Sequence, residues 1–84
     1  MSAPGYWLYE TSGVLAPVVE KYLDGRWLDL DEIAIFRRYL AQWMSGPWQG
    51  SAVAELRERV AQIRNRVELE SWLRDALDMG IDPL

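Results

Sequence analysis

The sequence predicts an all-α protein, a compact bundle of three to four short helices with an aromatic N-terminal arm. Two observations predict this fold. Apolar residues recur three and four positions apart along most of the chain, which is the period of an α-helix. Helix start and stop signals separate these periodic segments. Because 84 residues are too few for two independent cores, we expect a single domain over 1–84, with the arm at 1–12.

The first helix is expected at about 16–24. Pro17 is tolerated in the first turn of a helix, where a backbone N–H would have no partner within the helix. Gly25 then ends the helix, because glycine readily takes the left-handed conformation of a C-terminal turn. The residues expected on its inner face are Val18, Val19, Tyr22 and Leu23.

The second helix is expected at about 30–44, with clear signals at both ends. Asp29 is predicted as its N-cap, and Glu32 lies three residues further on, where its side chain can complete a capping box. The run Ser45-Gly46-Pro47 combines a C-terminal glycine with a proline that cannot continue the helix.

A third helix is expected at about 52–64, after a loop that leads to Ser51, its predicted N-cap. Its apolar positions follow one seam with spacings of three and four, namely Val53, Leu56, Val60, Ile63 and Val67. The seam fails after Val67, because its continuation falls on the charged residues Glu70 and Arg74.

This change of phase predicts a kink or a tight turn near Asn65, which forms a second N-cap pair with Glu68. A fourth helix is then expected at about 66–79, closed by Gly80. Ile81 occupies the position where a Schellman motif places its apolar contact. A single kinked helix is the alternative to two separate helices.

The composition argues against catalysis. The chain has no histidine and no cysteine, the residues most often used as general bases, nucleophiles and soft-metal ligands near neutral pH. We therefore expect no enzyme activity, no cofactor and no metal site. Nine basic against thirteen acidic residues give a net charge of −4, which disfavours nucleic acid as a partner. No apolar run approaches the roughly 20 residues of a membrane span, so we expect a soluble, cytoplasmic protein.

Five tryptophans, four tyrosines and one phenylalanine are many aromatic residues for so small a core, and this excess favours self-association. Trp48 stands between two helix breakers in the loop 46–50, a setting in which a rigid aromatic side chain can anchor a partner. The alternative is that Trp48 folds back over Trp43 and covers the core.

Arg37 is unusual because helical rotation places it beside Leu40 and Met44, on the apolar side of the second helix. A guanidinium there needs a carboxylate, a carbonyl, a partner chain or a phosphate-bearing ligand. One interpretation is that its stem lies along the edge of the core while its head pairs with Asp24 or Asp29. The other gives Arg37 a role at an interface or a ligand site.

Four further arginines flank the seam of the third helix. Arg57 and Arg64 lie seven residues apart on one flank, and Arg59 and Arg66 have the same spacing on the other. Arginines in such positions are typical of pairing between helices in bundles and dimers. Phosphate binding and a merely solvated face are the alternatives. The segment 67–84 is acidic, which suits pairing with the basic helix within the chain or between copies.

The C-terminal run from Trp72 to Leu84, together with Tyr39-Leu40-Ala41-Gln42-Trp43 and Pro47-Trp48, resembles small uncharacterised helical proteins of proteobacteria and their phages. These motifs are structural rather than catalytic, and the resemblance implies no activity and no site residue. It implies a setting among phage or mobile-element accessory proteins, many of which bind host proteins or small signalling molecules.

These observations favour a small non-enzymatic interaction module that self-associates and binds, inhibits or scaffolds a larger protein. A binder of a nucleotide or cyclic nucleotide at a subunit interface is the alternative. Trp48 or Tyr39 would then stack on the base. The arginines expected to reach the phosphate oxygens are Arg37, Arg57 and Arg64. DNA binding through the third helix is a weaker alternative, because the chain is acidic and a proline interrupts the preceding turn.

Overall fold

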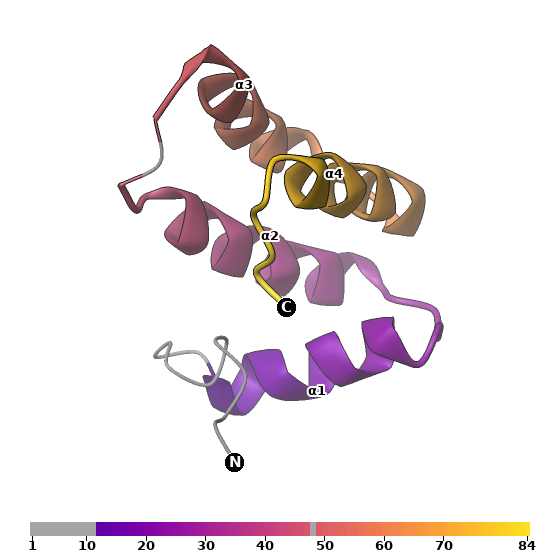
Figure 1. Ribbon diagram of the computed structural model, residues 1–84. Helices are drawn as coiled ribbons and strands as arrows, with labels where there is room; N and C mark the ends of the chain where they lie inside the picture. Colours follow the sequence, from indigo (N-terminus) through magenta and orange to yellow (C-terminus); the bar gives the residue numbers. More distant parts are fainter. Residues whose placement is uncertain (1–11, 48) are drawn as a thin grey trace.

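The computed structural model describes residues 12–47 and 49–84, and over these residues the chain is helical with no strand. Its elements, shown in Figure 1, are α1 (Ser12–Leu23), α2 (Leu30–Met44), α3 (Ser51–Arg59), the 3₁₀ turn η2 (Val60–Gln62) and α4 (Arg66–Asp78). The predicted all-α class and the separation of the last two helices are confirmed. Trp48 and residues 1–11 of the predicted arm lie outside the described residues.

α1 and α2 form an antiparallel pair joined by a short turn, while α3 and α4 lie on the other side of α2 (Figure 1). The segment that follows α4 runs back across α2 toward α1. This return places the last residues of the sequence beside the end of the first helix.

The core is built around three large aromatic side chains. Trp72, Tyr39 and Phe36 are each at most 1% exposed. The Phe36 ring meets the rings of Tyr22 and Tyr39 in edge-to-face contacts, with centroids 5.4 and 6.5 Å apart. Such contacts add to the stabilisation from burial alone. Aromatic side chains thus supply much of the buried area in a domain with few residues to bury it.

Two of the three predicted side-chain N-caps, Asp29 and Asn65, are present. The Asp29 carboxylate accepts a hydrogen bond from the Glu32 amide at 2.8 Å, and the Glu32 carboxylate accepts one from the Asp29 amide at 3.0 Å. At the start of α4, the Asn65 side-chain oxygen accepts a hydrogen bond from the Glu68 amide at 3.0 Å. These contacts satisfy amide groups that the first turn of a helix leaves without a partner.

Glu32 also joins α1 to α2, because the Lys21 ammonium lies 2.7 Å from its carboxylate. The hydrogen bond from Lys21, and then that from the Asp29 amide, hold the pKa of Glu32 below its ordinary value. The unfolded chain lacks these contacts, and its glutamate keeps a pKa of about 4.3. The stabilisation by Glu32 is therefore complete above about pH 4.3 and is lost as the pH falls through the lower pKa of the folded protein.

Replacing Glu32 by glutamine is expected to lower the free energy of unfolding by about 1 kcal/mol at neutral pH. The difference from the wild type should shrink as the pH falls from about 4.3 through the lower pKa of the folded protein, because the wild-type carboxylate is protonated over this range. Urea unfolding followed by circular dichroism measures both quantities. Glu58→Gln is the matched control, since Glu58 is exposed on α3. If the difference in the free energy of unfolding between the wild type and Glu32→Gln stays constant across this pH range, the Glu32 carboxylate does not stabilise the fold through its charge.

α1 and α4 both end in a Schellman motif, in which a left-handed glycine lets a following amide reach back to the helix. Gly25 has φ +74° at the end of α1, and Gly80 has φ +78° at the end of α4. After Gly80, the Ile81 amide donates to the Ala76 carbonyl at 2.9 Å. This confirms that Ile81 occupies the predicted Schellman position, and its side chain is 2% exposed.

α1 is longer than predicted, because it begins at Ser12 rather than near residue 16. Leu15 is fully buried, so packing against the core extends the helix by one turn beyond its local signals. Pro17 consequently lies in the second turn and is exposed, which removes one helical hydrogen bond without disturbing the buried face. Leu23 was predicted on the inner face but is 60% exposed at the end of α1.

α3 is shorter than predicted, because the chain tightens into η2 before residue 64. This turn keeps Val60 and Ile63 buried while it redirects the chain into α4. Gly50, rather than the predicted Ser51, takes the N-cap position, with φ +115°, a conformation that glycine adopts without strain. Val67 was predicted in the seam of the third helix, but it lies on α4 and is 75% exposed.

Candidate functional site

A groove lies between the end of α1, the outer side of α4 and the C-terminal segment, with a volume of about 580 Å³. Its apolar lining includes four leucines, Leu23, Leu73, Leu77 and Leu84. Two of them are largely in solvent, since Leu23 is 60% and Leu77 59% exposed. An apolar concave surface built from distant parts of the sequence is typical of a docking site for a partner.

α4 divides its apolar residues between the core and this groove. Leu69, Trp72 and Ala76 are buried inside the bundle. Leu73 and Leu77 each follow one of these buried residues by one position, which rotates them onto the adjacent side of the helix. Because they are one turn apart, they form a ridge along the groove.

The C-terminal segment forms the facing wall, and the core holds it in place. The Tyr39 hydroxyl, buried under this segment, donates a hydrogen bond to the Pro83 carbonyl. Pro83 itself is buried, and the Leu84 amide donates to the Asp82 carboxylate at 3.2 Å. The position of this wall therefore depends on a side chain of α2.

Tyr22 lies between the groove and the core. The Arg66 guanidinium carbon is 4.4 Å from the centroid of its ring, in a cation–π contact. Burial raises the pKa of the Tyr22 hydroxyl, and the nearby Glu70 carboxylate raises it further, while the charges of Arg66 and Arg74 act in the opposite direction. The phenol therefore stays neutral at physiological pH and can both donate and accept a hydrogen bond.

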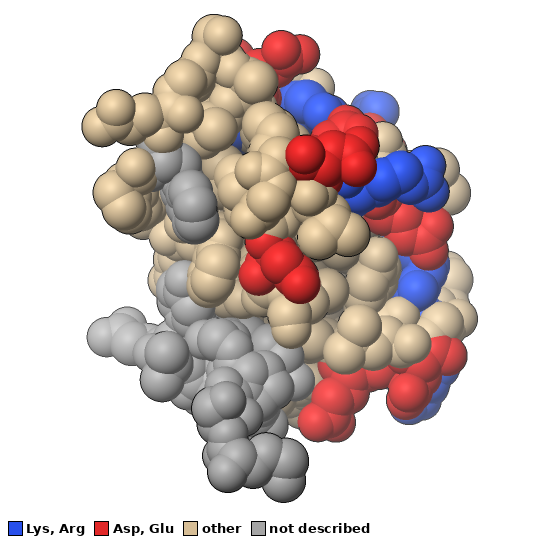
Figure 2. Space-filling model, in the orientation of Figure 1, with Lys and Arg blue, Asp and Glu red and all other residues tan. Residues whose placement is uncertain are grey.

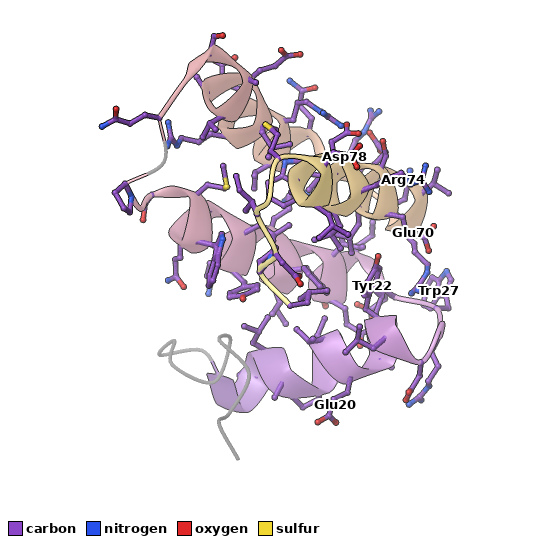
Figure 3. All side chains as sticks on the ribbon, in the orientation of Figure 1. Glu20, Tyr22, Trp27, Glu70, Arg74 and Asp78 are labelled. Atoms are coloured by element: carbon purple, nitrogen blue, oxygen red, sulfur yellow. The ribbon has the colours of Figure 1, made fainter. Side chains whose placement is uncertain are left out.

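The rim of the groove is charged. Glu70 and Arg74 on α4 and Asp82 in the C-terminal segment are among its lining residues. Asp78 does not line the groove but continues the row of Glu70 and Arg74 along α4 (Figure 3). Glu70 is already paired with Arg66 at 2.8 Å. Figure 2 shows acidic and basic side chains beside uncharged surface on this face of the molecule. The groove thus combines an apolar lining with charges that can orient an occupant.

Two of the predicted site residues, Arg37 and Arg57, join neighbouring helices. Arg37 on α2 donates to the Ile63 carbonyl at 2.8 Å, and Arg57 on α3 donates to the Met44 carbonyl at 2.8 Å. The predicted pairing of Arg37 with a nearby aspartate is wrong. Carbonyl groups at the end of a helix have no partner within it, and these two accept from a guanidinium instead.

Arg66 binds the end of α1 in the same way. From the start of α4, its guanidinium donates to the Tyr22 carbonyl at 2.7 Å and to the Arg26 carbonyl at 2.9 Å. Together with Arg37 and Arg57, it belongs to a set of three arginines that each bind carbonyl groups at the C-terminal end of another helical segment. This is the end at which a positive charge is favourable.

The other predicted flanking arginines pair with acids. Arg64 is 79% exposed and lies 3.2 Å from the Glu68 carboxylate. It precedes α4 in the turn after η2, so it shares no helix with Arg57. Arg59 on α3 lies 2.7 Å from the Asp75 carboxylate on α4, so the basic and acidic helices pair within one chain. Exposed ion pairs of this kind contribute little to stability.

Tyr39 was predicted as a stacking surface for a ligand, but it is fully buried. Its ring contacts Phe36 on one side and lies 6.3 Å from the centroid of Trp43. No face of the ring is open for stacking. The predicted nucleotide site is therefore not brought together within the described residues, and Trp48 lies outside them.

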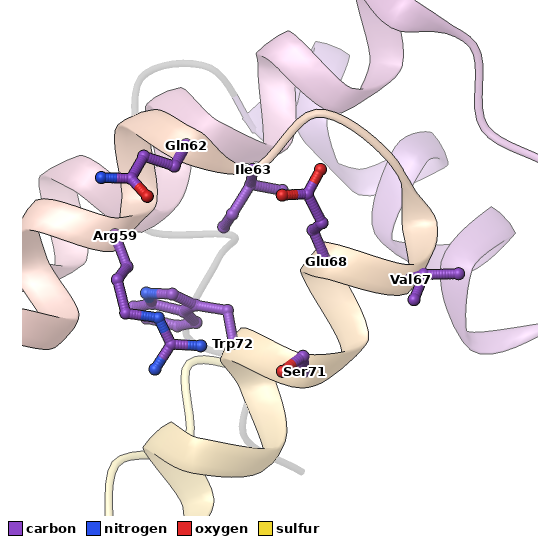
Figure 4. Close-up of a pocket in the computed structure, with 7 residues that line it drawn as sticks. All are labelled: Arg59, Gln62, Ile63, Val67, Glu68, Ser71 and Trp72. Atoms are coloured by element: carbon purple, nitrogen blue, oxygen red, sulfur yellow. The ribbon is translucent and has the colours of Figure 1, made fainter.

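A smaller hollow of about 300 Å³ lies between η2 and α4 (Figure 4). Figure 4 shows the Arg59 side chain alongside the Trp72 indole, with Val67 turned away from them. Arg59 and Glu68, its charged lining residues, already form ion pairs. Over residues 12–47 and 49–84, no cluster of three acidic side chains is arranged to hold a metal ion. The groove beside α1 is the stronger candidate.

The groove was not identified from the sequence. Leu73 and Leu77 are apolar residues of the predicted fourth helix, and helical period does not show which of two adjacent faces the rest of the protein covers. The sequence does contain one signal for the groove. The apolar residues between Leu69 and Leu77 cover a wider part of the helix surface than a single buried face needs. The return of the C-terminal segment onto α1 has no local signal.

Over the described residues, no helix is both long enough and apolar enough to cross a membrane. No protein-family model matches the chain, and comparisons with curated proteins and with solved structures also give no match.

Proposed function

We propose that this protein is a small non-enzymatic interaction module, which self-associates and binds a larger partner through the groove between α1, α4 and the C-terminal segment. The observation that carries the proposal is the exposure of Leu23 and Leu77 on a concave apolar surface. Leaving such side chains in water forgoes the stabilisation that burial brings, and a partner would recover it.

The arrangement of the groove supports a macromolecular occupant. Its lining comes from helices and from a segment that is anchored to the core through Tyr39, so its shape exists before binding. A preformed surface loses less entropy on association than one that must be ordered. The resemblance of the C-terminal motifs implies a biological setting for this module. It would be an accessory protein of a phage or mobile element that inhibits or scaffolds a host protein.

The nucleotide alternative has less support. Arg37 and Arg57 donate to backbone carbonyls, and Arg64 pairs with Glu68. A phosphate would have to displace these contacts, which lowers the net gain from binding.

Leu77→Asp tests the proposal, because it places a charge on the ridge of the groove. Leu77 is 59% exposed, so the free energy of unfolding should change by less than about 0.5 kcal/mol. We expect self-association in sedimentation velocity, and capture of partners in quantitative pull-downs, to be lost. Leu30→Asp is the matched control, since Leu30 is 79% exposed on α2 and does not line the groove. Equal binding by the wild type and the Leu77→Asp variant would rule the groove out.

A further inference from the structure

The outer side of α4 carries a regular pattern of charge. Glu70, Arg74 and Asp78 are spaced four residues apart and lie in a row along the helix (Figure 3). Leu73 and Leu77 lie beside this row with the same spacing and line the groove. The order along the helix is therefore negative, positive and negative, next to an apolar ridge.

Most of the other charged side chains of α4 form ion pairs with neighbouring side chains. Arg66 and Asp75 on α4 both take part in ion pairs. Arg74 and Asp78 are exposed, and neither forms a hydrogen bond or an ion pair within residues 12–47 and 49–84.

A two-fold axis converts this row into complementary pairs. In a symmetric dimer, if one residue faces a second residue of the partner, the second also faces the first. When two copies of α4 pack antiparallel with the axis at the level of residue 76, midway between Arg74 and Asp78, Arg74 faces the partner's Asp78. The same operation brings Asp78 opposite the partner's Arg74. The same operation brings Glu70 to the level of the partner's Asp82, which lies beyond the end of α4, and Arg66 compensates the charge of Glu70.

We infer that the groove side of α4 binds a second copy of this chain, in an antiparallel α4–α4 homodimer closed by two Arg74–Asp78 ion pairs. The inference rests on the proposed function and names the partner of the same groove. Burial of Leu73 and Leu77 against the second copy supplies the apolar contact. The two charge pairs fix the register and the direction of the helices.

Charge reversal tests the pairing. Arg74→Asp alone places two acids opposite each other at both pairs, and Asp78→Arg alone places two arginines there. Sedimentation equilibrium should show that each single variant raises the dimer dissociation constant at least about tenfold. The double variant Arg74→Asp/Asp78→Arg restores opposite charges and should return the constant to within about threefold of the wild type.

A mixture of the two single variants gives the sharpest result. In a heterodimer of Arg74→Asp with Asp78→Arg, both pairs again join opposite charges, so two proteins that dissociate alone should associate when mixed. Their association also shows that both variants are folded. Arg38→Asp is the matched control, because Arg38 is an exposed arginine on α2 and should leave the dissociation constant within about twofold of the wild type.

A wild type that stays monomeric at high micromolar concentration would overturn the inference, as would single reversals with the wild-type dissociation constant or a mixture that does not associate. Other outcomes distinguish a failure of the dimer from a failure of the proposed function. If the wild type is monomeric but Leu77→Asp still removes a captured partner that Leu30→Asp retains, the groove binds a different protein. If Leu77→Asp changes no binding at all, the groove is not the interaction site.

Discussion

Trp72→Ala is expected to lower the free energy of unfolding by about 3 to 5 kcal/mol, the usual cost of deleting a large buried aromatic side chain. Trp72 is 1% exposed and is the largest fully buried side chain among the described residues. A domain of this size has a total stability of roughly 4 to 13 kcal/mol. The variant should therefore be partly or wholly unfolded at physiological temperature.

A hydrogen bond adds to the loss of volume. The Trp72 indole donates to the Leu56 carbonyl at 2.8 Å. In a regular helix the Val60 amide would donate to this carbonyl, but at the end of α3 it donates to the Arg57 carbonyl instead. The indole thus supplies a donor where the chain tightens into η2, and removing it leaves a buried carbonyl at a cost of about 1 to 3 kcal/mol.

Urea unfolding followed by far-ultraviolet circular dichroism measures this effect without depending on tryptophan fluorescence. Trp72→Phe keeps most of the ring and removes the N–H, so it separates the hydrogen bond from the volume. Trp27→Ala is the control, because Trp27 is 77% exposed and its removal should change stability by less than about 0.5 kcal/mol. A Trp72→Ala variant within 1 kcal/mol of the wild type would mean that the core is not organised around this side chain.

Arg66→Ala is expected to lower the free energy of unfolding by about 2 to 3 kcal/mol. The substitution removes two hydrogen bonds to the end of α1, the ion pair with Glu70 and the contact with the Tyr22 ring. Hydrogen bonds from a charged donor are worth more than neutral ones, but the Arg66 side chain is 26% exposed, which reduces their contribution. Chemical denaturation again provides the measurement.

Arg64→Ala is the matched control, since Arg64 lies two positions earlier, is 79% exposed and forms one ion pair with Glu68. Its removal should cost no more than about 0.5 kcal/mol. Arg66→Lys should recover little of the lost stability, because a single ammonium does not present the planar fork that reaches two carbonyl groups at once. Equal effects of Arg66→Ala and Arg64→Ala would show that the carbonyl contacts contribute nothing.

Local chemistry predicted the helices well where a residue type carries the signal. Asp29 and Asn65 begin helices because their side chains bond to nearby amides, and Gly25 and Gly80 end helices because they accept a positive φ. These interactions span only a few residues. The fold class follows from them together with the apolar period.

The functional surface depended on contacts that local patterns do not encode. Arg66 donates to the backbone carbonyl of Tyr22. Because every residue has a backbone carbonyl, residue types do not indicate which carbonyl accepts a hydrogen bond from an arginine. Tyr39 looked available for stacking because its burial depends on the C-terminal segment folding over it. The exposure of Leu77 follows from the packing of the whole bundle, which leaves its side of α4 uncovered.

The three arginines that bind helix ends affect how the protein unfolds. Helix termini ordinarily fray one at a time, because the last turn can open without disturbing the rest of the protein. Here each of three helix ends is bound by an arginine of another helix. The end of α1 is bound by Arg66 on α4, the end of α2 by Arg57 on α3, and the end of η2 by Arg37 on α2. The last turn of each segment can therefore open only if the hydrogen bond from its arginine breaks. We therefore expect each local opening to be coupled to a neighbouring helix, so that the helices unfold as one cooperative unit rather than independently.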